Sequence, residues 1–152
     1  MMFLSTSERV IYEKGNGFIL SLLMSGCATS PVSNDEAKNV PQNRIFYSGT
    51  GSSKIVIIRD KGWMAGGGCY VMATMDGKEA ARLDTAEKVE LKVIPGRHII
   101  GLIGDRYGKA LCGLTSGSSK ETSTVINSGE TQFYRITGDT NSGLDIRPTT
   151  IY

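Results

Sequence analysis

Short runs of alternating polar and apolar residues dominate the chain after about residue 44. The clearest run is EKVELKVI, residues 87–94. It places Val89, Leu91 and Val93 on one face and Glu90 and Lys92 on the other. This period-two pattern is typical of a β-strand with one face in the core and one face in solvent.

Turn signals separate these runs. Asp76-Gly77 is the strongest, because Asp-Gly tolerates the positive φ angles of a two-residue type I′ hairpin turn, and Pro95-Gly96 marks another turn. Glycine is frequent, at 19 of 152 residues, and proline is scarce, at 4, which favours strands joined by tight turns. The sequence therefore predicts an all-β fold, a single antiparallel β-sandwich over residues 44–152 with about eight to ten short strands.

An uncharged apolar run, GFILSLLMSG at 17–26, follows the basic residues Arg9 and Lys14 and precedes Cys27. This run is too short for a transmembrane helix, which needs about 20 residues, and it suits the apolar region of a secretion signal. Its end, MSGC, resembles the bacterial lipobox, in which the cysteine is lipidated on sulfur and becomes the first residue of the mature protein. By that resemblance, residues 1–26 are a lipoprotein signal peptide and Cys27 carries the lipid.

Two other interpretations of this N-terminus stay open. Glu8 and Glu13 make the stretch before the apolar run more acidic than a signal needs, which fits a misplaced start and translation from further in, for example from Val10. Alternatively, residues 17–27 form a buried strand or short helix with a core cysteine.

Residues 27–43 are expected to form a flexible linker between the lipidated cysteine and the domain. The segment is rich in Ser, Asn and Pro and poor in large apolar side chains, so it buries too little surface to offset its ordering entropy. Ala28 rather than Asp follows the cysteine. By resemblance to the sorting rule of enterobacterial lipoproteins, this points to the outer membrane, with the domain facing the periplasm.

Cys69 and Cys112 remain if Cys27 carries lipid. An even pair of cysteines in an exported domain is typically oxidised to a disulfide. A pair of buried free thiols is one alternative. A zinc site is another, although one histidine and no CxxC motif offer few ligands. We therefore predict a Cys69–Cys112 disulfide, no metal ion and no cofactor.

The run YVMATMDGKEAARLDTAEKVELKVIPGRHIIGLI, residues 70–103, resembles the β-sandwich repeat of PEGA-type domains and of uncharacterised bacterial lipoproteins built on the same plan. The matching positions are Asp76, Gly77, Pro95, Gly96 and His98. All are turn or turn-adjacent residues. The resemblance therefore implies a fold, export and lipidation, and it implies no catalytic site.

His98 is the only histidine of the chain. As a general base it would need a nucleophile or an orienting carboxylate nearby, and Asp76, Asp84 and Asp105 are candidates. The interpretation that we favour is structural, with the ring hydrogen-bonded to a neighbouring turn. No carboxylate pair stands out for glycoside hydrolysis, so we predict no catalytic residue.

The segment GWMAGGGC, residues 62–69, is a candidate ligand-binding loop. Trp63, the only tryptophan, lies close to Gly66, Gly67 and Gly68, and a mobile backbone beside an amphipathic ring suits ligand binding. The alternative is that Trp63 packs on the core and the glycines form a bulge. Tyrosines that share a face with Trp63 would stack on sugar rings; the candidates are Tyr47, Tyr70, Tyr107, Tyr134 and Tyr152.

The charges argue against nucleic acid as a partner. The 17 Lys and Arg residues and 15 Asp and Glu residues are scattered along the chain, whereas a nucleic-acid-binding protein presents a clustered basic face. We predict a non-catalytic, lipid-anchored envelope lipoprotein that acts as an interaction or structural module, with an envelope protein or a cell-wall glycan as partner. The alternative is a ligand-binding module or inhibitor that recognises a cell-wall glycan or a secreted hydrolase such as lysozyme. An envelope hydrolase is a third interpretation.

Overall fold

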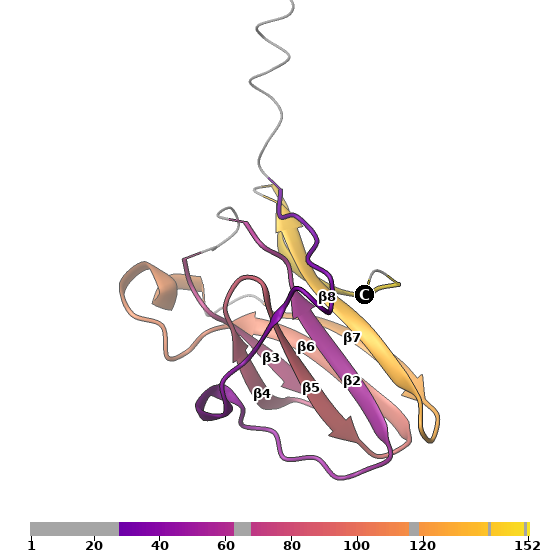
Figure 1. The fold of residues 1–152 in the computed structure, drawn as a ribbon. Coiled ribbons are helices and arrows are strands. Elements are labelled where there is room, and N and C mark those ends of the chain that lie inside the picture. The colour runs from indigo at the N-terminus through magenta and orange to yellow at the C-terminus, as the bar shows by residue number, and fades with distance from the viewer. Residues whose placement is uncertain (1–27, 63–67, 116–118, 140, 151) are drawn as a thin grey trace, which may run out of the picture.

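The computed structural model describes residues 28–62, 68–115, 119–139, 141–150 and 152, and these ranges form two packed β-sheets (Figure 1). The five-stranded sheet has the order β1, β5, β2, β8, β9, and the four-stranded sheet has the order β4, β3, β6, β7. The all-β sandwich predicted from the sequence is confirmed. The strands are β1 Lys38–Asn39, β2 Ser53–Arg59, β3 Val71–Met75, β4 Lys78–Leu83, β5 Glu87–Val93, β6 Gly96–Gly104, β7 Ser119–Ile126, β8 Thr131–Asp139 and β9 Gly143–Pro148; two short 3-10 helices are η1 Gln42–Arg44 and η2 Ala110–Thr115.

The hydrophobic core lies between the sheets, where the alternating strands point their apolar side chains. On β5, the side chains of Val89, Leu91 and Val93 are buried and those of Glu90 and Lys92 are exposed, as the alternation predicts. Each fully buried aliphatic side chain contributes about 1.5–3 kcal/mol to stability. The same core includes, from other strands, Ile55, Ile57, Val71, Ala73, Met75, Ala81, Leu83, Ile100, Leu102 and Ile136.

The predicted Asp-Gly hairpin turn joins β3 to β4. Asp76 has a φ angle of 52° and Gly77 a φ angle of 78°, so both central residues lie in the left-handed region that a type I′ turn requires. The side chain of Asp76 also accepts a hydrogen bond from the backbone N–H of Ile99, at 2.8 Å, which ties the turn to β6.

The pairing is mixed rather than purely antiparallel. β2 pairs with β8 in parallel, from Lys54 opposite Thr131 to Arg59 opposite Ile136, and β1 pairs with β5 in parallel. The Pro95-Gly96 turn joins β5 in one sheet to β6 in the other. The turn therefore carries the chain across the sandwich instead of closing a hairpin.

The linker predicted for residues 27–43 is not a flexible tether in its described part, residues 28–43, and that prediction was wrong. This segment packs along the outer face of the five-stranded sheet, and it contains the strand β1 and the start of η1. Val32, Ala37 and Val40 are 3%, 7% and 5% exposed. Val32 and Ala37 pack with Val56 and Ile58 of β2, so β2 is buried on both faces. Two apolar residues of the segment, Val32 and Ala37, are enough to cover this face, whereas Val40 packs in the core between the sheets.

Local hydrogen bonds shape this N-terminal segment. The Ser33 hydroxyl accepts a hydrogen bond from the Glu36 N–H at 3.3 Å, and the Glu36 carboxylate accepts one from the Ser33 N–H at 3.2 Å. This reciprocal pair closes a turn, and the hydrogen bonds lower the pKa of Glu36. Lys88 of β5 donates to the carbonyl of Asn34 at 2.6 Å. The folded domain therefore begins by residue 28 and not near Arg44.

The predicted signal peptide and Cys27 lie outside the described residues. Within the described residues, no helix has the length and apolar character needed to cross a membrane.

Candidate functional site

The predicted disulfide is present. Cys69, just before β3, is bonded to Cys112 of η2, with their Cα atoms 5.4 Å apart. Gly68 is exposed, and a side chain at its position would meet open space. The other candidates of the predicted ligand-binding loop, Trp63, Gly66 and Gly67, lie outside the described residues. Within the part of the chain that the structure describes, no group of three or more His, Cys, Asp or Glu side chains lies close enough to hold a metal ion.

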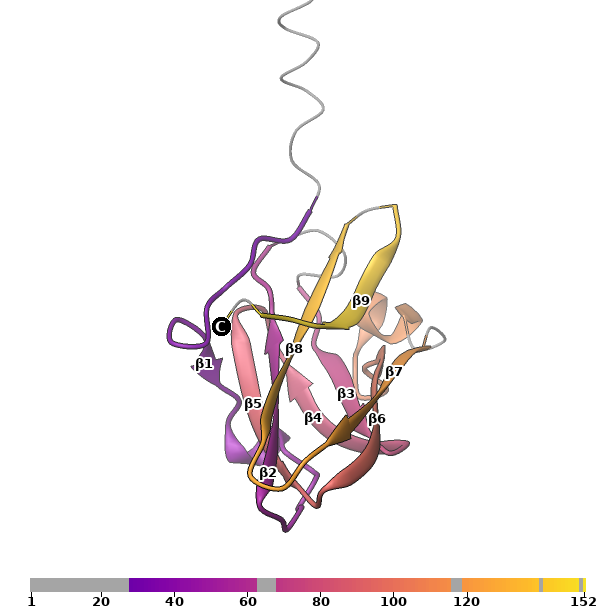
Figure 2. The ribbon, with the colours of Figure 1, turned by 90° about the vertical axis from the view of Figure 1, so that its right-hand side faces the viewer.

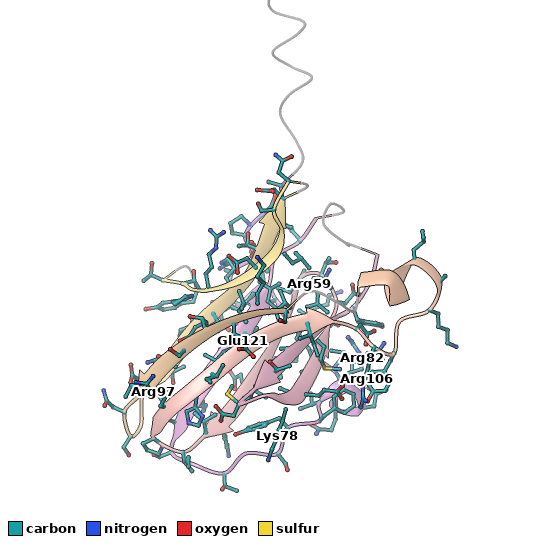
Figure 3. The ribbon with its side chains drawn as sticks, turned by 180° about the vertical axis from the view of Figure 1, so that it is seen from behind. Arg59, Lys78, Arg82, Arg97, Arg106 and Glu121 are labelled. Carbon is teal, nitrogen blue, oxygen red and sulfur yellow. A yellow bond between two sulfur atoms is a disulfide. The ribbon has the colours of Figure 1, made fainter. Side chains whose placement is uncertain are left out.

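Beside the disulfide, guanidinium groups and tyrosine rings stack in alternation. The guanidinium carbons of Arg44 and Arg82 each lie 4.6 Å from the centroid of the Tyr70 ring. Arg82 also lies 5.3 Å from the ring of Tyr107, and Arg106 lies 4.8 Å from that ring. We call these five residues the arginine–tyrosine cluster. Figure 3 shows Arg82 and Arg106 next to each other at one side of the sandwich.

Carboxylates hold the three arginines of the cluster in place. Arg44 binds Glu87 through two hydrogen bonds of 2.8 and 2.7 Å, and Arg82 binds the buried Asp105 through two of 3.0 and 2.6 Å. Arg106 pairs with Glu79. The hydrogen bond that Arg44 donates to Glu87 outweighs partial burial and raises the pKa of Arg44. The hydrogen bond to Tyr107 and the charge of Glu79 raise the pKa of Arg106. Each arginine of the cluster is thus paired with one carboxylate, which balances its charge and orients its side chain.

The rings of the cluster remain partly open to solvent. Tyr70 is 36% exposed and Tyr107 is 45% exposed. Phe46, also 45% exposed, lies with its ring centroid 6.0 Å from that of Tyr107. These aromatic rings come from three separate parts of the chain: the segment after η1, the start of β3 and the loop after β6. The fold thus brings aromatic rings and guanidinium groups together on an exposed surface. No contiguous sequence motif predicts this surface.

Arg59 supports the cluster from inside the sandwich. Its side chain is buried, and it donates hydrogen bonds of 2.7 Å to the carbonyls of Cys69 and Leu83. Burial lowers the pKa of Arg59 to about 10, against the raising effect of the charges of Asp84 and Glu87. Cys69 precedes Tyr70 and Leu83 follows Arg82, so one buried cation fixes the backbone under two members of the cluster.

The structure brings only some of the predicted tyrosines together. Tyr70 and Tyr107 join the cluster, whereas Tyr134 is buried in the core and Tyr47 packs partly against it. Tyr152 stacks on Phe133, with the ring centroids 4.2 Å apart. The sequence holds no comparable signal for Arg44, Arg82 and Arg106, because they are single arginines in separate parts of the chain.

His98 has the structural arrangement that we favoured. It is 5% exposed, and its Nδ1 lies 2.7 Å from Oδ2 of Asp76 and its Nε2 lies 2.6 Å from the carbonyl oxygen of Ile94. Both neighbours are acceptors, so both ring nitrogens donate when the ring is protonated. The other two candidate carboxylates bind elsewhere: Asp105 binds Arg82, and Asp84 binds the N–H of Thr85.

This arrangement predicts a pH-dependent stability. Burial lowers the pKa of His98, but the hydrogen bonds to Ile94 and Asp76 and the charge of Asp76 outweigh it, so the net shift raises the pKa. A raised pKa in the folded state stabilises the fold fully below the ordinary value of about 6.5, and the contribution is lost as the pH rises through the folded value. Urea unfolding of the wild type should therefore give a lower free energy of unfolding at mildly alkaline pH than at pH 6. A His98→Gln variant should lose most of this slope, and an unchanged slope would contradict the assignment.

Comparisons with protein-family models, with curated proteins and with solved structures found no match. The resemblance of residues 70–103 to PEGA-type lipoproteins therefore stays a prediction.

Proposed function

We propose that this protein is a non-catalytic, lipid-anchored lipoprotein of the bacterial envelope, and that it binds a protein partner through the arginine–tyrosine cluster. The observation that carries the proposal is the alternating stack of Arg44, Tyr70, Arg82, Tyr107 and Arg106. Arginine and tyrosine are enriched where protein interfaces concentrate their binding energy. The lipid anchor at Cys27 and the outer membrane are the location that the lipobox resemblance implies.

The geometry favours a protein over a cell-wall glycan as the partner. A sugar ring stacks on an open aromatic face, but two guanidinium groups already lie over the ring of Tyr70 and two over the ring of Tyr107. Tyr70 and Tyr107 remain partly exposed, and the side chain of Arg106 is 63% exposed. Such a preordered surface loses little side-chain entropy on binding. A secreted hydrolase inhibited by this protein is one partner of this kind.

Photo-crosslinking in living cells tests the proposal. A benzophenone amino acid at Tyr107 should give a discrete crosslinked protein species, and the same probe at Ser128 should not. Ser128 is the matched control because it is also exposed and lies in the turn between β7 and β8, away from the cluster. Arg106→Ala, a change at an exposed side chain, should weaken the crosslink several-fold without unfolding the domain.

Two results would contradict the proposal. Identical crosslinking patterns at positions 107 and 128 would show that the cluster has no specific partner. Crosslinks to glycan fragments in place of protein would favour the alternative, a cell-wall-binding module.

A further inference from the structure

The first described residues of the chain are pinned to one end of the sandwich. The N–H of Thr29 donates to the carbonyl of Gly138 at 2.9 Å, and the Thr29 hydroxyl accepts a hydrogen bond from the N–H of Gly138 at 3.0 Å. Ser30 and Lys61 exchange two backbone hydrogen bonds, of 2.8 and 3.1 Å. Ala28 forms an isolated bridge with Asp139. Two residues further on from Ser30, Val32 is buried and its carbonyl accepts a hydrogen bond from Arg135 at 3.1 Å.

This end of the sandwich is defined by the last residue of β8, the turn to β9 and the residues after β2. Figure 2 shows the start of the described chain beside the β8–β9 connection, with the β7–β8 turn at the opposite end. From Thr131 to Asp139, β8 spans about 26 Å. The two ends of the molecule are therefore well separated, and they face opposite ways along the strands.

The first described residue at this end, Ala28, directly follows the predicted lipidation site Cys27 in the sequence. Consecutive Cα atoms are only about 3.8 Å apart. If Cys27 carries the lipid, as in the proposed function, then no slack segment separates the folded domain from the bilayer surface. The glycerol of the lipid sits at the level of the phospholipid headgroups, and Ala28 must lie beside it.

The chemistry of this end suits a headgroup layer. Its exposed side chains include Ser30, Lys61, Asn141 and Ser142. A cavity of about 210 Å³ opens beside Ala28 and Thr29, and its charged lining comprises Lys120, Asp139, Asp145 and Arg147. Two cations and two carboxylates complement the phosphate and ammonium groups of zwitterionic phospholipids.

We propose that the domain contacts the membrane directly through this end, with the turn between β8 and β9 against the phospholipid headgroups of the leaflet that holds the Cys27 lipid. The arginine–tyrosine cluster lies on the side of the sandwich formed by β4, the start of β3 and the loop after β6. Direct contact therefore holds it at a fixed height above the bilayer. This inference rests on the lipid anchor of the proposed function, and it adds an orientation.

Fluorescence quenching in proteoliposomes tests the contact. The full, lipidated protein would carry a single free cysteine, Asn141→Cys, Lys61→Cys or the control Ser128→Cys, labelled with a small fluorophore. The bilayer would be phosphatidylethanolamine and phosphatidylglycerol with a nitroxide on a fraction of the headgroups. We expect quenching at positions 141 and 61 to be several-fold stronger than at position 128, and to vanish when detergent replaces the bilayer.

The outcomes separate the two proposals. If the protein floats with the vesicles but quenching is equal at positions 141, 61 and 128, the direct membrane contact is wrong. The lipid anchor would still be supported in that case. Protein that does not float with the vesicles would overturn both, because no anchor would then hold the domain. Positions 141 and 61 lie in different loops. Strong quenching at both would show that the contact is not an effect of one substitution.

Discussion

Asp60→Asn is expected to lower the free energy of unfolding by about 3–5 kcal/mol, because it removes the charge of a buried carboxylate that pairs with a buried arginine. Asp60 follows β2 and pairs with Arg135 of β8, and their side chains are 1% and 6% exposed. The pair crosses between the parallel strands β2 and β8, and Arg135 also reaches the Val32 carbonyl of the N-terminal segment at 3.1 Å. Asparagine keeps the size of Asp60 but removes its charge. Urea unfolding monitored by circular dichroism gives the measurement.

Asp145→Asn is the matched control for this prediction. Asp145 pairs with Arg147 at 2.9 Å, but these side chains are 36% and 64% exposed. Exposed ion pairs contribute at most about 1 kcal/mol, so the control should unfold close to the wild type. Equal losses in the two variants would contradict the account of the buried pair.

Removal of the disulfide, through Cys69→Ser together with Cys112→Ser, should cost about 4 kcal/mol. The two cysteines are 43 residues apart in the sequence. The loss of the crosslink frees this loop in the unfolded chain, and the entropy of the unfolded state rises accordingly. Thermal and urea unfolding of the double variant, compared with the oxidised wild type, measure the difference.

The reduced wild type provides the control for the serine substitutions. If the stabilisation comes from the crosslink, reduction of the bridge and the double substitution should destabilise the domain by similar amounts. A double variant as stable as the oxidised wild type would contradict the prediction. Because Tyr70 adjoins Cys69, loss of the bridge should also weaken the crosslink from position 107.

The sequence predicts the sheet-forming segments well, because their signals are local. Alternation on β5 and the Asp-Gly turn between β3 and β4 each depend on a few adjacent residues, and both appear as expected. The pairing of Cys69 with Cys112 is predicted on the premise that Cys27 carries a lipid, because an even pair then remains. The parallel pairing of β2 with β8 depends on which of the two sheets each strand joins. No local sequence pattern, such as that at Pro95-Gly96, shows which sheet the next strand joins.

The N-terminal segment shows where average composition misleads. Residues 28–43 are polar on average, yet Val32 and Ala37 cover the outer face of the sheet and Val40 packs in the core. Burial depends on where a few apolar residues fall, and only the folded sheet supplies the surface that they cover. The candidate site has the same character, because Arg44, Tyr70 and Arg106 become neighbours only when η1, β3 and the loop after β6 meet.

Metabolic labelling with palmitate tests the central claim that Cys27 anchors this domain to a membrane. Wild-type protein should take up the label and fractionate with membranes, whereas a Cys27→Ser variant should lose the label and remain unprocessed. Label that persists in the variant, or wild-type protein that carries none, would contradict the anchor and the membrane contact inferred from it.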